Sequence, residues 1–185
     1  MNTFPLQWII IAGVVVIALL SMAAWVFSQN KKQSARLQQR FGSEYGRTVG
    51  ELGGRTKAES ELKAREKRVE DLTITRLAPA EGARFSQAWN ALQARFVDNP
   101  KGVVVQADQL VRELMIERGY PMGDFERRAA DISVDHPTVV EHYRAAQAIA
   151  ARDVHGEADT EELRKAVVHS RVLFDEMLEV SCVEH

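Results

Sequence analysis

The chain has 185 residues, of which 45% are hydrophobic and 27% are charged, and its formal net charge is −2. This balance argues against a nucleic-acid-binding protein, because phosphate contacts need clustered Lys and Arg. Its single cysteine, Cys182, excludes a disulfide framework within the chain and fits a reducing compartment.

Residues 6–27 form an uncharged apolar run in which Gln7 and Ser21 are the only polar side chains. At about 1.5 Å per residue the run is roughly 33 Å long, enough to cross a hydrocarbon core of about 30 Å. Trp8 and Trp25 lie near its two ends, where aromatic side chains favour the headgroup boundary. The sequence therefore predicts a transmembrane helix at 6–27 after a short tail at 1–5, with an apolar core helix as the alternative.

We expect this segment to be kept rather than removed as a signal peptide. No Lys or Arg precedes it, and it is longer than the usual apolar region of about 7 to 15 residues. Apolar residues also continue past Ser21 and Ala23, the small residues that would resemble a cleavage site.

Basic residues flank the span on one side only: Lys31, Lys32, Arg36 and Arg40 follow it within a few turns. Because basic flanks stay in the cytoplasm, we expect the N-terminus outside and everything after residue 30 inside, at the cell (inner) membrane. These four side chains and the two tryptophans are the predicted membrane-interface residues, with the lipid bilayer as a partner.

Residues 28–78 are predicted to be a basic, glycine-containing neck followed by a charged helical stalk. Four glycines recur every four residues: Gly42, Gly46, Gly50 and Gly54. On a helix they would form a small-residue packing face, but each costs about 1 kcal/mol of helix stability, so a bent or flexible neck is the other interpretation. From 55 to 71 charges of both signs are interleaved, which predicts a solvated helix, with a short coiled coil as the alternative.

After Pro79 apolar residues recur at helical spacing in five successive segments. Phe85, Trp89 and Leu92 share one helix face, and Asp159 with Glu162 predicts a capping box. Short connections between such segments are typical of an antiparallel bundle. The predicted fold class is all-α, with a transmembrane helix, a stalk, and a helical bundle at 79–185 that folds without the span.

Short blocks of the chain resemble an uncharacterised bacterial family whose members have a single N-terminal membrane span and a helical soluble domain. The blocks are Arg40-Phe41-Gly42, Glu44-Tyr45, Phe96-Val97-Asp98, Arg118-Gly119-Tyr120-Pro121, Ala130-Asp131-Ile132-Ser133-Val134-Asp135-His136-Pro137 and Leu173-Phe174. The resemblance covers most of the chain after residue 40. It implies a bacterial origin and a membrane anchor, and no activity.

No catalytic, cofactor-binding or metal-binding residue is predicted. The five histidines include no pair spaced three or four apart, as a metal pair on one helix would need. Asp135-His136-Pro137 is the stretch most similar to a site. Pro137 suits the first position of a helix, which makes His136 the cap, with Asp135 and Ser133 placed to complement the N–H groups of the first turn. We predict a structural cap rather than a site.

Two classes of function remain. The first is a single-pass membrane protein whose cytoplasmic helical domain is an interaction or scaffold module for a protein partner, without a cofactor or nucleic acid. The alternative is a membrane-tethered enzyme with a site assembled from helix ends around Asp131, Asp135 and His136. An exposed apolar groove between helices favours the module, whereas a polar pocket of substrate size favours the enzyme.

Overall fold

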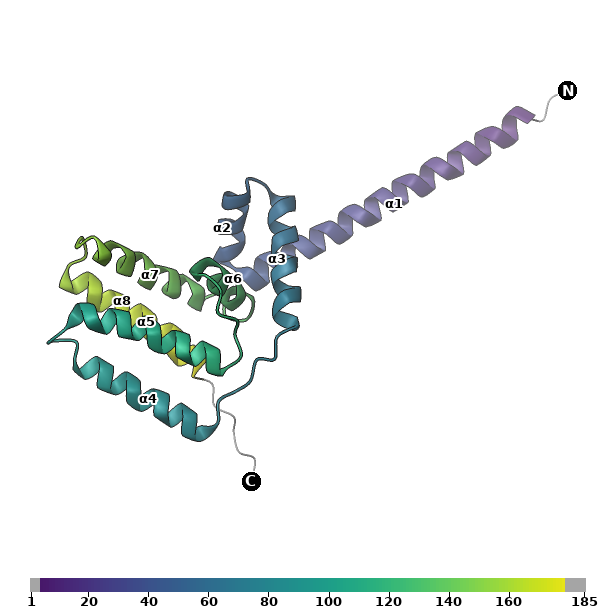
Figure 1. Cartoon of the computed structure of the whole chain (residues 1–185). Helices are drawn as coiled ribbons and strands as arrows, with labels where there is room; N and C mark the ends of the chain where they lie inside the picture. The colour runs from purple at the N-terminus through teal and green to yellow at the C-terminus, as the bar shows by residue number, and fades with distance from the viewer. Residues whose placement is uncertain (1–3, 179–185) are drawn as a thin grey trace. The chain divides into compact units, whose positions relative to one another are not determined.

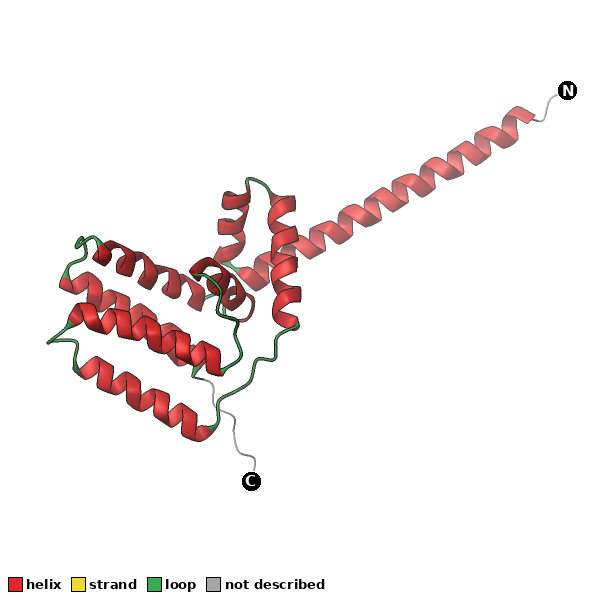
Figure 2. Ribbon diagram, in the orientation of Figure 1, coloured by secondary structure: helices red, strands yellow, loops and turns green. Residues whose placement is uncertain are grey.

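The computed structural model describes residues 4–178, which form helices joined by loops (Figures 1 and 2). The helices are α1 (Phe4–Phe41), α2 (Ser43–Leu52), α3 (Arg55–Glu70), α4 (Pro79–Ala94), α5 (Pro100–Glu117), α6 (Phe125–Asp135), α7 (Val139–Val154) and α8 (Thr160–Met177). No strand occurs among these residues, so the all-α prediction is confirmed.

The chain divides into two compact units, Met1–Arg40 and Phe41–His185. Helices α2 and α3 come from the sequence predicted as neck and stalk, and they belong to the second unit together with α4 to α8.

Helix α1 is long and apolar enough to cross a membrane. Its part from Gly13 to Phe41 contains an 18-residue window with a mean hydropathy of 1.6, none of which is buried. The predicted span at 6–27 lies within α1, and the polar residues at 28–40 continue the same helix. Trp25 is 64% exposed, and Lys31 and Lys32 are exposed as well. Trp8 lies in α1, with its side chain outside the described part of the structure.

Helices α2 and α3 pack against each other as a helical hairpin. Gly53 has a φ of +65°, a left-handed conformation that favours glycine and ends α2. Gly46 and Gly50 lie inside α2, and a Cβ atom at either would meet nothing within 4 Å. Within the described residues nothing therefore packs against these two glycines, and α2 is held through buried residues such as Tyr45, whose hydroxyl donates to Glu59 of α3 at 2.9 Å.

Helix α3 is not a solvated stalk. Ala58 and Leu62 are completely buried and Val69 is 6% exposed, because α3 packs against both α2 and α6. The apolar residues of α3 do form a buried face, but they contact helices of the same chain instead of a coiled-coil partner. The segment between α3 and α4 is not helical, and its Leu77 belongs to the main core.

The core of the second unit lies where α4, α5, α7 and α8 meet. Helix α8 packs against both α5 and α7, and α4 packs against α5. The ring of Trp89 on α4 lies 4.6 Å from that of Phe174 on α8. The predicted capping box starts α8: Glu162 N donates to Asp159 Oδ1 at 2.8 Å, and Asp159 N donates to Glu162 Oε2 at 3.1 Å.

The turn after α5 is fixed to the connector that precedes α4. Gly119 has a φ of +92°, and a Cβ atom there would lie 2.5 Å from the carbonyl oxygen of Thr73. The backbone N–H of Thr75 donates to the carbonyl of Arg118 at 3.0 Å, and Arg118 Nε donates back to the carbonyl of Thr75 at 3.1 Å. Only glycine fits this close backbone approach.

Candidate functional site

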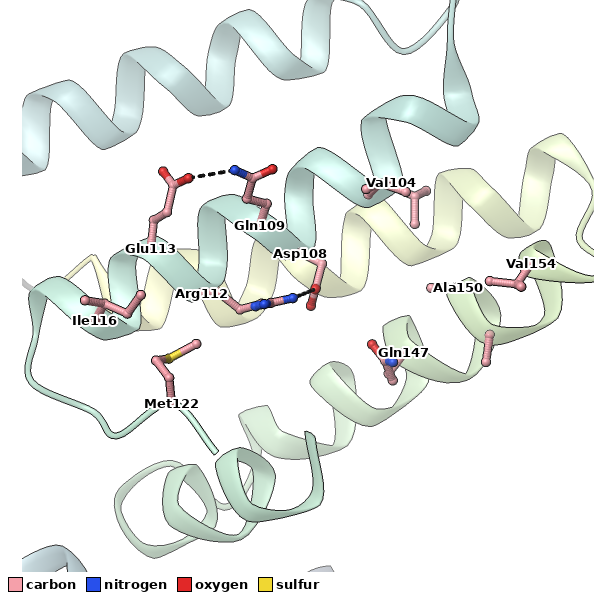
Figure 3. Close-up of a pocket in the computed structure, with 12 residues that line it drawn as sticks. Val104, Asp108, Gln109, Arg112, Glu113, Ile116, Met122, Gln147, Ala150 and Val154 are labelled. Atoms are coloured by element: carbon pink, nitrogen blue, oxygen red, sulfur yellow. Dashed lines mark hydrogen bonds and ion pairs between the residues drawn. The ribbon is translucent and has the colours of Figure 1, made fainter. Parts of the chain in front are cut away.

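Helices α5 and α7 both pack against α8 and leave a groove of about 580 Å³ between them, lined also by Met122 from the loop after α5. Figure 3 shows α8 passing behind this groove, with the labelled side chains of α5 and α7 on its two walls. We call it the α5–α7 groove.

The two ends of the α5–α7 groove are apolar and open to solvent. Ile116 is 55% exposed and Met122 is 39% exposed at one end, while Val105 is 66% exposed and Val154 is 82% exposed at the other. Val105 and Ile116 lie eleven positions apart on α5, which is about three turns, or roughly 16 Å, on one helix face. The groove thus presents two separate apolar contacts along one line.

The middle of the groove is polar. Arg112 pairs with Asp108 one turn earlier, at 3.4 Å, and Gln109 donates a hydrogen bond to Glu113 at 3.0 Å. The Glu113 carboxylate is therefore bonded to a neutral amide rather than to a cation. Gln147 adds a further polar side chain from α7 (Figure 3).

The sequence of α5 explains why the groove stays open. One face of α5 carries fully or almost fully buried residues such as Val103, Ala107 and Leu114, and these join the core. The next face carries the Asp108–Arg112 ion pair, whose charges would lose hydration if α7 closed over them. Helix α7 lines this part of the groove with Gln147 and the small side chains Ala150 and Ala151, which fill little of the space between the two helices.

A second hollow, of about 250 Å³, lies between α2 and α7 and is lined by charged groups. Arg144 donates to both carboxylate oxygens of the buried Glu44, at 2.9 and 3.3 Å, and to Glu126 at 2.6 Å. Arg65 Nη1 lies 3.7 Å from the same Glu44. Burial lowers the pKa of Arg144, but the hydrogen bonds to Glu44 and Glu126 outweigh this effect, so the pKa is raised and the guanidinium stays charged. These groups neutralise one another's charge, which is the pattern of an internal ion-pair cluster.

The residues of the alternative enzyme site face different helices. The Asp131 carboxylate is buried and pairs with Arg68 of α3 at 2.9 Å and more distantly with Arg127 at 3.8 Å. His136 Nδ1 lies 2.9 Å from Glu176 on α8, and Asp135 is exposed at the end of α6. Asp131 therefore joins α6 to α3, whereas His136 joins the α6–α7 junction to α8.

The predicted cap at Asp135-His136-Pro137 needs correction. Asp135 and Ser133 lie inside α6, and the buried Ser133 hydroxyl donates to the carbonyl of Ala130 at 2.6 Å instead of capping the next helix. His136 is a cap, but it ends α6. Its carbonyl also accepts the N–H groups of Val139 at 3.1 Å and Val140 at 3.2 Å, so its backbone serves both helices.

Two features were missed by sequence reasoning. One is the α5–α7 groove, for which a signal existed, because Val105 and Ile116 are apolar yet fall outside the buried stripe of α5. The other is a contact between His142 on α7 and His169 on α8, whose Nδ1 atoms lie 2.9 Å apart. No spacing rule finds such a pair, because its members belong to different helices.

Among the residues that the structure describes, no group of three or more His, Cys, Asp or Glu side chains is arranged to hold a metal ion. Comparisons of the chain with protein-family models, curated proteins and solved structures find no match.

Proposed function

We propose that this protein is a single-pass, membrane-anchored interaction module that binds an amphipathic helix of a partner protein in the α5–α7 groove. The observation that carries the proposal is the groove itself, with exposed apolar side chains at both ends and a polar middle. The second unit is a helical bundle that presents this groove in the cytoplasm.

The membrane anchor is supported by the surface of α1. Ile17 is 66% exposed, Leu20 is 65% exposed and Phe27 is 73% exposed, and a continuous apolar surface of this kind calls for lipid or a protein partner. The basic residues that follow support an orientation with the second unit inside, at the inner membrane of a bacterial cell. They are Lys31, Lys32, Arg36 and Arg40.

A helix fits the groove better than a small molecule does. The two apolar ends of the groove match a helix that carries apolar residues eleven positions apart, since eleven residues complete about three turns. Ala150 and Ala151 allow such a helix to approach α7 closely, and helix axes pack about 8 to 10 Å apart. Glu113 favours a Lys or Arg between the two apolar residues of the partner.

A pair of synthetic helical peptides tests this proposal. One has leucines eleven positions apart with a lysine between them, and the other has glutamate in place of the lysine. Fluorescence anisotropy with the full chain in detergent should show binding of the lysine peptide, with at least a tenfold loss for Val105→Glu and for Ile116→Glu. Glu113→Lys should reverse the preference toward the glutamate peptide.

The matched control is Val168→Glu, which places the same charge at an exposed valine on α8, outside the groove lining. This variant should bind the lysine peptide like the natural protein. The proposal fails if a scrambled peptide binds equally well, if neither peptide binds, or if Val168→Glu is as damaging as Val105→Glu.

A further inference from the structure

Lysines without an ion-pair partner lie on the outer face of α3. Lys57, Lys63 and Lys67 are exposed, and none of them forms an ion pair within the described range 4–178. On a helix they lie within an arc of about 120°, on the side opposite the buried residues of α3. Ser60 and Ala64 are exposed small side chains in the same arc. We call these five residues the α3 lysine face.

The acidic side chains in the middle of α3 point to other partners. Glu59 accepts a hydrogen bond from Arg55 at 2.9 Å. Glu61 accepts one from Arg65 at 3.2 Å, and Glu66 is buried. Charges that alternate along the sequence are therefore separated in the fold, with the lysines directed to solvent and these carboxylates engaged elsewhere.

The α3 lysine face is most cationic near the tip of the α2–α3 hairpin. The exposed carboxylates Glu70 and Asp71 lie at the other end of α3, three and four positions after Lys67. At the tip, Leu52 is 39% exposed at the end of α2, before the short loop that leads to Arg55. An apolar side chain beside basic ones suits the boundary between lipid headgroups and water.

The rest of the second unit is acidic. Residues 76–185 contain 13 Lys or Arg and 19 Asp or Glu. The cytoplasmic leaflet of a membrane carries anionic lipids, whose potential acts on charged groups within about a Debye length. An anionic bilayer therefore attracts the α3 lysine face and repels the acidic helices, which determines the side of the unit that turns toward the lipid.

The chain is long enough for such a contact. Residues 28–41 continue α1 for about 21 Å beyond the predicted span. Headgroups occupy about 5 to 7 Å on each side of the hydrocarbon core, which leaves roughly 15 Å. Helix α2 has 10 residues and is about 15 Å long, so the tip of the hairpin can reach the headgroups.

We propose that the α3 lysine face binds anionic lipid headgroups, so that the second unit lies against the membrane surface instead of extending freely from its anchor. This inference rests on the proposed membrane anchor. Lysine ammonium groups are flexible, strongly hydrated point charges. The contact is therefore reversible, and it selects for the charge of the lipid rather than for one headgroup.

A fluorescent probe tests this contact in the full chain reconstituted into vesicles. Cys182 is replaced by Ser, and either Ala64→Cys or Val168→Cys, which is exposed on α8, is labelled with a fluorophore that spin-labelled headgroups quench. With phosphatidylglycerol present, the probe at position 64 should be quenched at least about twofold more than the probe at position 168. Phosphatidylcholine alone should quench both equally. Salt at about 1 M, where the Debye length is roughly 3 Å, should remove the difference.

Paired lysine substitutions distinguish the α3 lysine face from a general effect of charge. Lys57→Gln together with Lys63→Gln should abolish the extra quenching at position 64. Lys101→Gln together with Lys165→Gln is the matched control, because it removes the same charge from the two exposed lysines of 41–185 that lie outside the face. The control should retain the extra quenching. The proposal is overturned if phosphatidylglycerol has no effect at position 64, if the first pair keeps the extra quenching, or if the control pair loses it.

Flotation of the same vesicles tests the membrane anchor separately. A chain with a membrane span floats with phosphatidylcholine vesicles at any salt concentration, since its insertion does not depend on lipid charge. A chain that does not float overturns the proposed anchor, and this inference with it. A chain that floats with both lipids but shows equal quenching at positions 64 and 168 keeps the anchor and overturns only the lipid contact of α3.

Discussion

At the scale of single residues, Glu44 is the central anion of an ion-pair cluster in the second unit. Its buried carboxylate lies within 4 Å of three guanidinium groups, those of Arg144, Arg65 and Arg47. Glu44→Gln leaves these groups without their central anion, so we expect the free energy of unfolding to fall by about 2 kcal/mol or more. Urea unfolding of the full chain in detergent measures the loss.

Glu161→Gln is the control for Glu44, because it removes a carboxylate from a fully exposed pair with Arg164. Solvent screens such a pair, and we expect no measurable change in stability. Equal effects of the two substitutions would show that the burial of Glu44 does not matter.

Alanine substitutions at two glycines with left-handed backbones distinguish the cost of backbone strain from the cost of a steric clash. Both Gly119, with a φ of +92°, and Gly156, with a φ of +73°, are unfavourable for alanine by about 1 to 2 kcal/mol. Only at Gly119 would the added methyl group also meet a carbonyl oxygen, that of Thr73. In urea unfolding, Gly119→Ala should therefore be clearly less stable than Gly156→Ala. Similar losses would mean that the contact with Thr73 relaxes easily.

His169 predicts a pH dependence of stability. Burial, and secondly His142, lower its pKa, so the unfolded chain binds a proton at a higher pH than the folded chain does. The resulting stability is complete above the unfolded pKa of about 6.5 and is lost as the pH falls below it.

Melting curves recorded with a chelator should show a smaller decrease of Tm between about pH 6.5 and 5 in His169→Gln than in the natural chain. His155→Gln should keep the natural slope. Parallel curves for His169→Gln and the natural chain would show that His169 does not cause the pH dependence of Tm.

At the scale of elements, α3 shows which structural features the pattern of apolar residues in a sequence can predict. Its apolar positions Leu62 and Val69 are evident from the sequence, and both are buried. The helix or helices that bury them are not evident, because eleven of the seventeen residues at 55–71 are charged and predict exposure. Some of these charged residues form ion pairs inside the fold, since Arg68 donates a hydrogen bond to Asp131, sixty-three positions away.

Helix starts and buried stripes were predictable for a different reason, namely that they depend on residues within one or two turns. The capping box of Asp159 and Glu162 is such a case, and it is confirmed. The α6–α7 junction was assigned wrongly because Ser133 has a hydrogen-bond partner within its own helix that competes with capping the next one. The groove and the histidine pair depend on how separate helices are placed, which no local pattern contains.

Removal of the α2–α3 hairpin tests its contribution to the fold. A fragment starting at Phe41 contains the whole second unit, whereas one starting at Asp71 exposes the surface of α6 that α3 covers and deprives Asp131 of Arg68. Circular dichroism should show cooperative melting of the longer fragment, and a lower Tm or loss of folding for the shorter one. Equal Tm values of the two fragments would show that α2 and α3 do not stabilise the rest of the second unit, as expected of a separate stalk.

At the scale of the whole molecule, the proposed topology places the second unit in the cytoplasm. A phosphatase that is active only outside the cytoplasm should be inactive when fused after His185, whereas a fluorescent protein at the same position should fluoresce. The reason is the basic cluster that follows the span, since such residues resist transfer across the membrane. Neutralising Lys31, Lys32, Arg36 and Arg40 together should raise phosphatase activity. An active phosphatase on the natural sequence contradicts the orientation.

The ion pair between Arg68 and Asp131 has a consequence for the order in which the chain folds during synthesis. Arg68 leaves the ribosome sixty-three residues before Asp131 does. At about 5 to 20 residues per second, the nascent hairpin waits roughly 3 to 13 s before α6 exists to cover it. During this interval the part of α3 that α6 later covers is exposed among the surrounding charges. We expect the charge density at 55–71 to keep the unfinished chain soluble, so replacing those charges should reduce the yield of folded protein more than its final stability.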